Sequence, residues 1–108
     1  MPVALTELSH ELEPALKAVR NIAASHRVAR LEAFGSAATG RLQKTSDVDL
    51  LVVFEPMSVQ EHGNHYFGLK YDLEDALGRP VDLVELKAVT NPYFLAAIEA
   101  ERVLLYDA

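Results

Sequence analysis

The chain has 108 residues, of which 50% are hydrophobic and 24% are charged, and it contains no cysteine. Sixteen acidic against ten basic residues give a formal net charge of −6, which argues against direct binding of a nucleic-acid backbone, and no apolar run approaches the ~20 residues that span a bilayer. The lack of cysteine excludes a disulfide framework and thiolate metal sites. Together with an N-terminus that is unlike a signal peptide, it indicates a cytoplasmic protein. The length predicts a single domain over residues 1–108.

Apolar spacing and turn residues predict the elements of the first half. Residues 5–24 carry apolar side chains at three- and four-residue steps, which is typical of an amphipathic helix. Pro14 lies inside this pattern and either kinks the helix or stands in its first turn. A strand is predicted over 28–34, ending at Gly35, and a helical turn over 37–40.

The second half continues the alternation. A mostly buried strand over 47–54 precedes a helix that a Ser58–Glu61 capping box begins and Gly78 ends. The remaining predicted elements are a strand over 81–86, a helix from Asn91-Pro92 to about Ala100, and a short closing strand over 103–106. Helices that alternate with three or four short strands predict an α/β (α+β) fold, a small mixed β-sheet with helices packed against it.

Two carboxylates stand at the start of the most apolar predicted strand. Asp47 and Asp49 are two positions apart, so strand alternation directs both to one face, with Cα atoms ~6.6 Å apart. An ionised carboxylate that is drawn toward a core needs a compensating charge. All-oxygen ligands suit a hard cation such as Mg²⁺, and two carboxylates at this spacing can hold one ion or bracket two ions ~3.5–4 Å apart.

A third carboxylate and a glycine turn complete the candidate site. Asp82 is the second residue of the predicted strand 81–86; if that strand lies beside the first, Asp82 either ligates metal or takes a proton from an attacking hydroxyl. Alternation sends Glu85 of the same strand to the opposite face. Gly35 and Ser36 have the features of an anion site, because glycine lets a phosphate approach the backbone and serine offers a hydroxyl and an N–H.

Phosphate held by a Gly-Ser turn, with metal held by nearby carboxylates, is the equipment of phosphoryl or nucleotidyl transfer. Three basic residues flank these parts and are candidates for phosphate contacts: Arg41, Lys44 and Arg79. Plain surface charge is the alternative for each of them.

The stretch FGSAATGRLQKTSDVDLLVVF, residues 34–54, resembles the signature of the DNA polymerase beta-type nucleotidyltransferase superfamily: Gly-Ser, a ten-residue spacer, then Asp-x-Asp. Element order and length are similar to those of the minimal nucleotidyltransferase (MNT) proteins. The resemblance implies the nucleotidyltransferase fold, with Asp47 and Asp49 binding two Mg²⁺, Asp82 completing the site, and Gly35-Ser36 holding ATP. MNT proteins commonly pair with a HEPN-domain toxin as its antitoxin, in some cases by transferring AMP from ATP to a toxin tyrosine.

These expectations favour a Mg²⁺-dependent nucleotidyltransferase, a protein adenylyltransferase that moves AMP from ATP to a hydroxyl of a partner HEPN toxin, with tyrosine the expected acceptor. One alternative is a catalytically idle antitoxin that neutralises its toxin by binding and occlusion. Another is transfer to a small molecule, as in the antibiotic nucleotidyltransferases, which usually carry an additional domain that is not present here.

Two further groups of residues need an interpretation. His62 and His65 could share a metal, but a solvated or partner-facing pair is favoured because no further ligand lies near them in sequence. Tyr93, Phe94 and Leu95 are expected in the core, and would suggest an interface only if they formed an exposed patch.

Overall fold

A four-stranded mixed sheet organises the part of the chain that the computed structural model describes, residues 12–38 and 47–108. Its strand order is β3-β2-β1-β4; β2 and β3 are parallel, and the other neighbours are antiparallel. The elements are η2 (Glu13–Ala15), α1 (Leu16–Ser25), β1 (Val28–Ala33), η3 (Gly35–Ala37), β2 (Val48–Phe54), α2 (Val59–Leu77), β3 (Val81–Glu85), η4 (Leu86–Ala88), α3 (Pro92–Ala100) and β4 (Val103–Asp107). The predicted sheet with helices packed against it is confirmed. Within these residues, no helix has the length and apolar character needed to cross a membrane.

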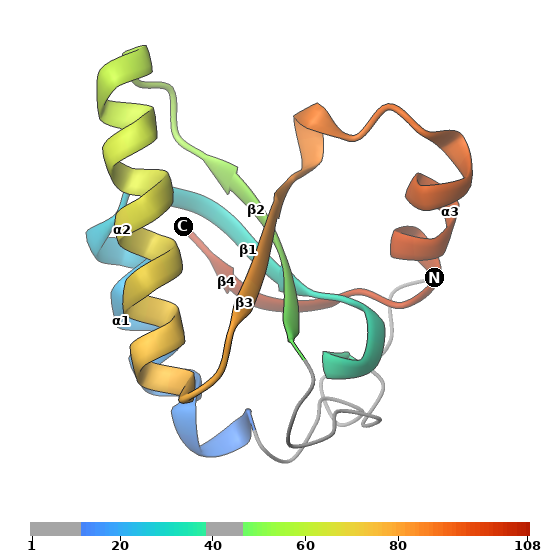
Figure 1. Cartoon of the computed structure of the whole chain (residues 1–108), viewed down its shortest axis with the longest axis horizontal. Helices are drawn as coiled ribbons and strands as arrows, with labels where there is room; N and C mark the ends of the chain where they lie inside the picture. Colours follow the sequence, from blue (N-terminus) through green and yellow to red (C-terminus); the bar gives the residue numbers. More distant parts are fainter. Residues whose placement is uncertain (1–11, 39–46) are drawn as a thin grey trace.

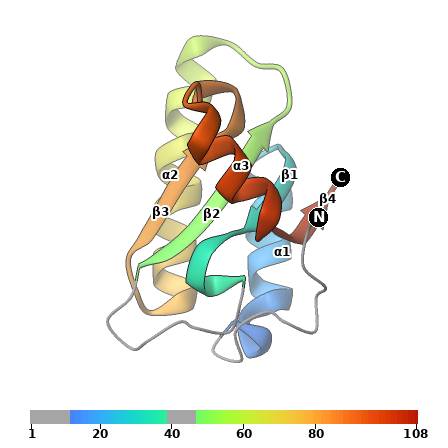
Figure 2. The ribbon, with the colours of Figure 1, turned by 90° about the vertical axis from the view of Figure 1, so that its right-hand side faces the viewer.

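The helices divide between the two faces of the sheet (Figures 1 and 2). Helices α1 and α2 cover one face, where Leu50 and Val52 of β2 lie in the main core. The shorter helix α3 lies on the other face, where Leu51 is buried with Phe34 and Ile98. β2 is therefore covered on both faces, which is why its sequence is a continuous apolar run rather than an alternating one.

The helix ends follow the local sequence signals. The Ser58 hydroxyl accepts a hydrogen bond from the Glu61 N–H at 3.2 Å and donates to Glu61 Oε1 at 2.9 Å, which confirms the capping box. Gly78 ends α2 in the left-handed region with φ of 68°. Pro14 lies in the 3₁₀ turn that precedes α1, so it stands at the start of the regular helix rather than kinking it. The part of the predicted helix before residue 12 lies outside the described residues.

Helix α3 corrects one expectation. Asn91 caps it as predicted, with its side-chain oxygen accepting from the Tyr93 N–H at 2.9 Å. However, Tyr93 is 85% exposed and Phe94 39% exposed, whereas Ile98 is buried. The prediction that the aromatic cluster belongs to the core was therefore wrong for both rings. A single short helix presents only one row of side chains to a sheet, so the neighbouring positions face solvent.

The C-terminal turn of α2 is tied to the first residue of β3 by charge-assisted hydrogen bonds. Glu74 Oε2 accepts from the Val81 N–H at 2.9 Å and from Lys70 Nζ at 3.0 Å, and Lys70 also donates to the Val81 carbonyl at 2.6 Å. The hydrogen bond from Val81, and after it the one from Lys70, hold the pKa of Glu74 below its ordinary value of 4.5.

We expect Glu74→Gln to lower the free energy of unfolding at pH 7, because the amide oxygen can accept from Val81 but lacks the charge that Lys70 pairs with. Since the folded-state pKa is depressed, this stabilisation is present above about pH 4.5 and is lost as the pH falls through the folded pKa. Urea unfolding at pH 7 and at about pH 3 measures the loss of stability at neutral pH and its disappearance in acid. Asp75→Asn, at an exposed position one residue further along the helix, is the control; a Glu74→Gln deficit that stays constant with pH would contradict the assignment.

Candidate active site

The three predicted aspartates gather where β2 and β3 begin. In the parallel pairing, Asp49 lies directly opposite Asp82, and Val48 opposite Val81. Side chains at paired positions of neighbouring strands project to the same face, with backbones ~4.8 Å apart. The expectation that the third acid stands beside the first two is therefore confirmed for Asp49, and Asp47 directly precedes β2.

Burial and neighbouring negative charge both act on the Asp49 carboxylate. The pKa of Asp49 is raised, first by its burial and then by the negative charges of Asp82 and Asp47. Asp47 and Asp82 are themselves exposed. A half-buried carboxylate between two others is costly in its ionised form, so this end of the sheet favours a bound cation.

Gly35 brings the turn after β1 against this carboxylate. Its φ is +63°, in the left-handed region, and a Cβ built on it would lie 2.9 Å from Asp49 Oδ2. The preceding Phe34 N–H donates to the Asp49 carbonyl at 3.1 Å, which fixes the turn to β2. Sequence reasoning selected Gly35 for phosphate access, and the structure adds that a residue without a side chain also makes room for Asp49.

The structure describes only some of the residues that were predicted to contact phosphate. Arg41 and Lys44 lie outside the described residues, and Ser36 is described only as part of the backbone of η3. Arg79 is half-exposed in the turn before β3, next to Pro80, whose carbonyl accepts from the Val48 N–H at 2.9 Å. The backbone of Arg79 is therefore at the same end of the sheet as the aspartates.

The donor set fits a hard divalent cation that shares its coordination with a substrate. Among residues 12–38 and 47–108, no three His, Cys, Asp or Glu side chains form a group that would hold a metal ion by themselves. Mg²⁺ seldom requires such a cage, because it keeps several waters and is usually bound by one or two carboxylates together with substrate phosphates. Asp49 and Asp82 provide adjacent oxygen ligands of this kind, and Asp47 precedes them on the chain.

A separate hollow of about 230 Å³ lies at the opposite end of β2 and β3. It is lined mostly by apolar groups, from Val52 to Phe54 and from Glu85 to Lys87. The carboxylates begin these strands and the hollow lies where the strands end, so the hollow is not part of the aspartate group.

The histidines of α2 do not act as a pair. His62 Nε2 contacts Glu85 Oε1 at 2.7 Å, on the face of β3 opposite to Asp82, as alternation predicts for Glu85. His65 Nδ1 instead lies 3.2 Å from Nδ1 of His26. The expectation of a solvated His62–His65 pair was wrong, because each ring is partly buried and contacts another element. Its alternative, a pair that faces a partner protein, stays a prediction. Sequence reasoning did not select His26, whose partner lies 39 positions away.

Comparisons with known proteins agree on one domain type. The family described as nucleotidyltransferase domain matches residues 15–105. The candidate protein adenylyltransferase MJ1379 of Methanocaldococcus jannaschii is 33% identical over 76 residues, which cover 70% of this chain and 75% of that protein. A solved structure of a candidate minimal nucleotidyltransferase has a TM-score of 0.68 at 33% identity, covering 85% of this chain and 90% of that one.

A more distant likeness concerns the fold alone. One chain of a complex between a tri-AMPylated Shewanella oneidensis HEPN toxin and an MNT antitoxin has a TM-score of 0.60 at 16% identity. The match covers 89% of this chain and 72% of that one.

Proposed function

The chain belongs to the nucleotidyltransferase domain family, and on that premise we propose that it is a Mg²⁺-dependent protein adenylyltransferase. In this proposal AMP passes from ATP to a tyrosine hydroxyl of a HEPN-domain toxin, for which the chain is the antitoxin. The observation that carries the proposal is the direct pairing of Asp49 with Asp82, with the Asp49 carboxylate against Gly35.

In the proposed reaction, the tyrosine oxygen forms a bond to the α-phosphorus of ATP while the bond from that phosphorus to the bridging oxygen breaks. Pyrophosphate leaves with the electron pair, and the hydroxyl proton passes to a carboxylate. Asp82, exposed at the site, is the candidate acceptor for this proton or a further metal ligand. Gly35 and Ser36 are proposed to orient the triphosphate, with Arg41 and Lys44 as further phosphate contacts.

Asp47 and Asp49 are proposed to hold the divalent ions, with Asp82 completing the ligand set. When bound, Mg²⁺ would neutralise the charge that develops on the phosphate oxygens. Asp49 has a short side chain and is half-buried, and we propose that this positions its carboxylate before the substrate arrives.

The choice of acceptor and partner is supported by the relatives rather than by the geometry. MJ1379 carries the name of a protein adenylyltransferase, and the Shewanella complex contains an AMPylated HEPN toxin together with an MNT antitoxin. The exposed first turn of α3, with Tyr93 and Phe94, gives this small domain an apolar surface that a partner could cover.

The proposal is tested by incubating the protein with Mg-ATP and the product of the neighbouring gene, followed by intact-mass spectrometry of that product. We expect the neighbour to gain the mass of one or more AMP groups, and tandem mass spectrometry to place them on tyrosine. No added mass would contradict the transferase, as would added mass that persists in the Asp47→Asn/Asp49→Asn double variant.

The same double variant separates catalysis from occlusion. If it still neutralised the neighbouring protein fully at equal expression, the chain would be an idle antitoxin that works by binding. The transferase proposal requires that neutralisation be lost with AMP transfer.

A further inference from the structure

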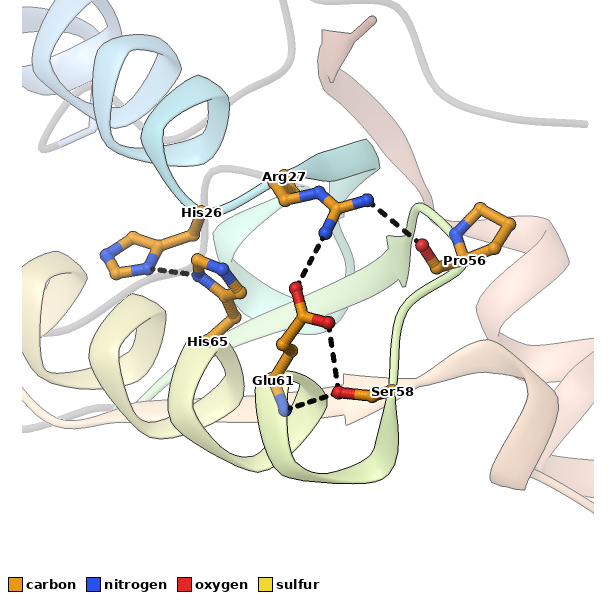
Figure 3. Close-up of polar contacts among 6 residues, drawn as sticks. All are labelled: His26, Arg27, Pro56, Ser58, Glu61 and His65. Atoms are coloured by element: carbon orange, nitrogen blue, oxygen red, sulfur yellow. Dashed lines mark hydrogen bonds and ion pairs between the residues drawn. The ribbon is translucent and has the colours of Figure 1, made fainter.

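Two imidazoles from different elements face each other on the α1–α2 side of the fold (Figure 3). His26 lies in the turn between α1 and β1, and His65 lies on α2; their Nδ1 atoms are 3.2 Å apart. On its other nitrogen, His26 Nε2 contacts Asp72 Oδ2 at 2.7 Å. We propose that His26 and His65 form a binding site for a transition-metal ion of the Zn²⁺ class, separate from the aspartate site.

The tautomer of His26 supports this assignment. An ionised carboxylate only accepts hydrogen bonds, so the Asp72 contact places a proton on His26 Nε2 and leaves a lone pair on Nδ1 of the neutral ring. A histidine whose far nitrogen donates to a carboxylate is the usual arrangement around metals, because that bond orients the ring and raises its basicity. In the metal-free chain, the same lone pair accepts from the Nδ1–H of His65.

The separation of the nitrogens fits a shared ion. With metal–nitrogen distances of ~2.0–2.1 Å, two nitrogens 3.2 Å apart subtend about 100° at the metal, between the octahedral and tetrahedral angles. Binding requires that His65 carry its proton on Nε2 instead of Nδ1, so the ion replaces the hydrogen bond between the rings without net loss of a proton. Because no third His, Cys, Asp or Glu completes a cage within the described ranges, water takes the remaining coordination positions.

The two elements that carry the rings are held in register by neighbouring contacts. Arg27 adopts φ of 58° and donates through Nη1 to Glu61 Oε2 and through Nη2 to the Pro56 carbonyl, each at 3.0 Å (Figure 3). The Ser58 hydrogen bonds, and after them the charge of Arg27, hold the pKa of Glu61 below its usual value. Glu61 is therefore ionised near the site, and with Asp72 it makes the surroundings favourable for a cation.

A glycine makes room for His26. A Cβ built on Gly68 would lie 2.6 Å from His26 Cε1, so the ring occupies the space that any side chain at this position would fill. On the same helix, a Cβ on Gly63 would have no atom within 4 Å. This contrast supplies a matched pair of substitutions that leave both histidines in the sequence.

The test is calorimetric titration of the full chain with ZnCl₂ in excess Mg²⁺, which is added to compete with Zn²⁺ for the proposed aspartate site. We expect one Zn²⁺ per chain, with affinity at least tenfold weaker in His65→Ala and clearly weaker in Gly68→Ala. His62→Ala and Gly63→Ala should bind within about twofold of the wild type. Gly→Ala changes favour helix by up to ~1 kcal/mol, so Gly68→Ala remains folded unless the displaced ring disturbs the core.

Two outcomes would overturn the proposal. Unchanged affinity in His65→Ala would mean that Zn²⁺ is held elsewhere, for example by His10, which lies outside the described residues. Equal weakening by Gly68→Ala and Gly63→Ala would mean that the ring position is irrelevant. Ring resonances of His26 and His65 that shift together on addition of Zn²⁺, while those of His62 do not, would support it. None of these measurements depends on AMP transfer.

Discussion

Gly35→Ala is expected to reduce AMP transfer by at least ~10²-fold while lowering stability by only ~1–2 kcal/mol. The stability cost is that of a left-handed backbone in a residue with a Cβ. The larger effect on the rate has a separate cause, since the new methyl group would displace the Asp49 carboxylate, whose Oδ2 lies 2.9 Å from the Cβ position. A shift of about 1 Å in a catalytic group can cost 10²-fold.

Gly78→Ala is the matched control, because Gly78 has φ of +68° but nothing within 4 Å of a built Cβ. Urea unfolding should give both variants a similar loss of stability, and the transfer assay should leave Gly78→Ala nearly as active as the wild type. Equal activity losses in the two variants would mean that backbone strain, rather than the position of Asp49, explains the effect.

Asp49→Asn is expected to remove transfer, by at least ~10²-fold, and yet to raise the stability of the metal-free protein at pH 7. The pKa of Asp49 is raised by burial and by its acidic neighbours, so its ionised form opposes folding. With the folded pKa above the ordinary 3.8, this penalty is absent at low pH and grows as the pH rises through that range. The gain should stay below ~1 kcal/mol, since the carboxylate is partly exposed to solvent.

Unfolding in the presence of a chelator, at pH 7 and at about pH 3, measures this effect against the wild type. Glu55→Gln is the control, because it removes a carboxylate at an exposed position just beyond the end of β2, away from the three aspartates. An Asp49→Asn protein that is less stable than the wild type at pH 7 would show that the carboxylate is a structural group. A protein that retains full transfer would remove Asp49 from the reaction.

The sequence predicted the fold and the closeness of Asp49 to Asp82, because both depend on local patterns. Strand periodicity placed Asp49 and Asp82 near the starts of their strands, and the cap at Ser58 and the stop at Gly78 bounded the long helix. Parallel pairing then brought the two carboxylates to one level. These features need only short-range chemistry and one rule of sheet assembly.

What could not be predicted depends on how elements meet in space. Tyr93 was expected in the core because it is aromatic. Its burial depends on how many of the residues around α3 contact the sheet, and the sequence does not show that number. The contact between His26 and His65 likewise arises from how the turn before β1 lies against α2. Its one local trace is Gly68, whose missing side chain has no obvious role within a helix.

The length of the connection between α2 and β3 fixes the position of Asp82 relative to Asp49. Glu74 and Lys70 anchor Val81, and Pro80 bonds to Val48, so the span from 74 to 81 sets the level at which β3 meets β2. One residue more or less in it would slide Asp82 by ~3.3 Å and turn it toward the opposite face of the sheet. The length of this connection therefore constrains the candidate active site, in a way that residue identity alone does not reveal.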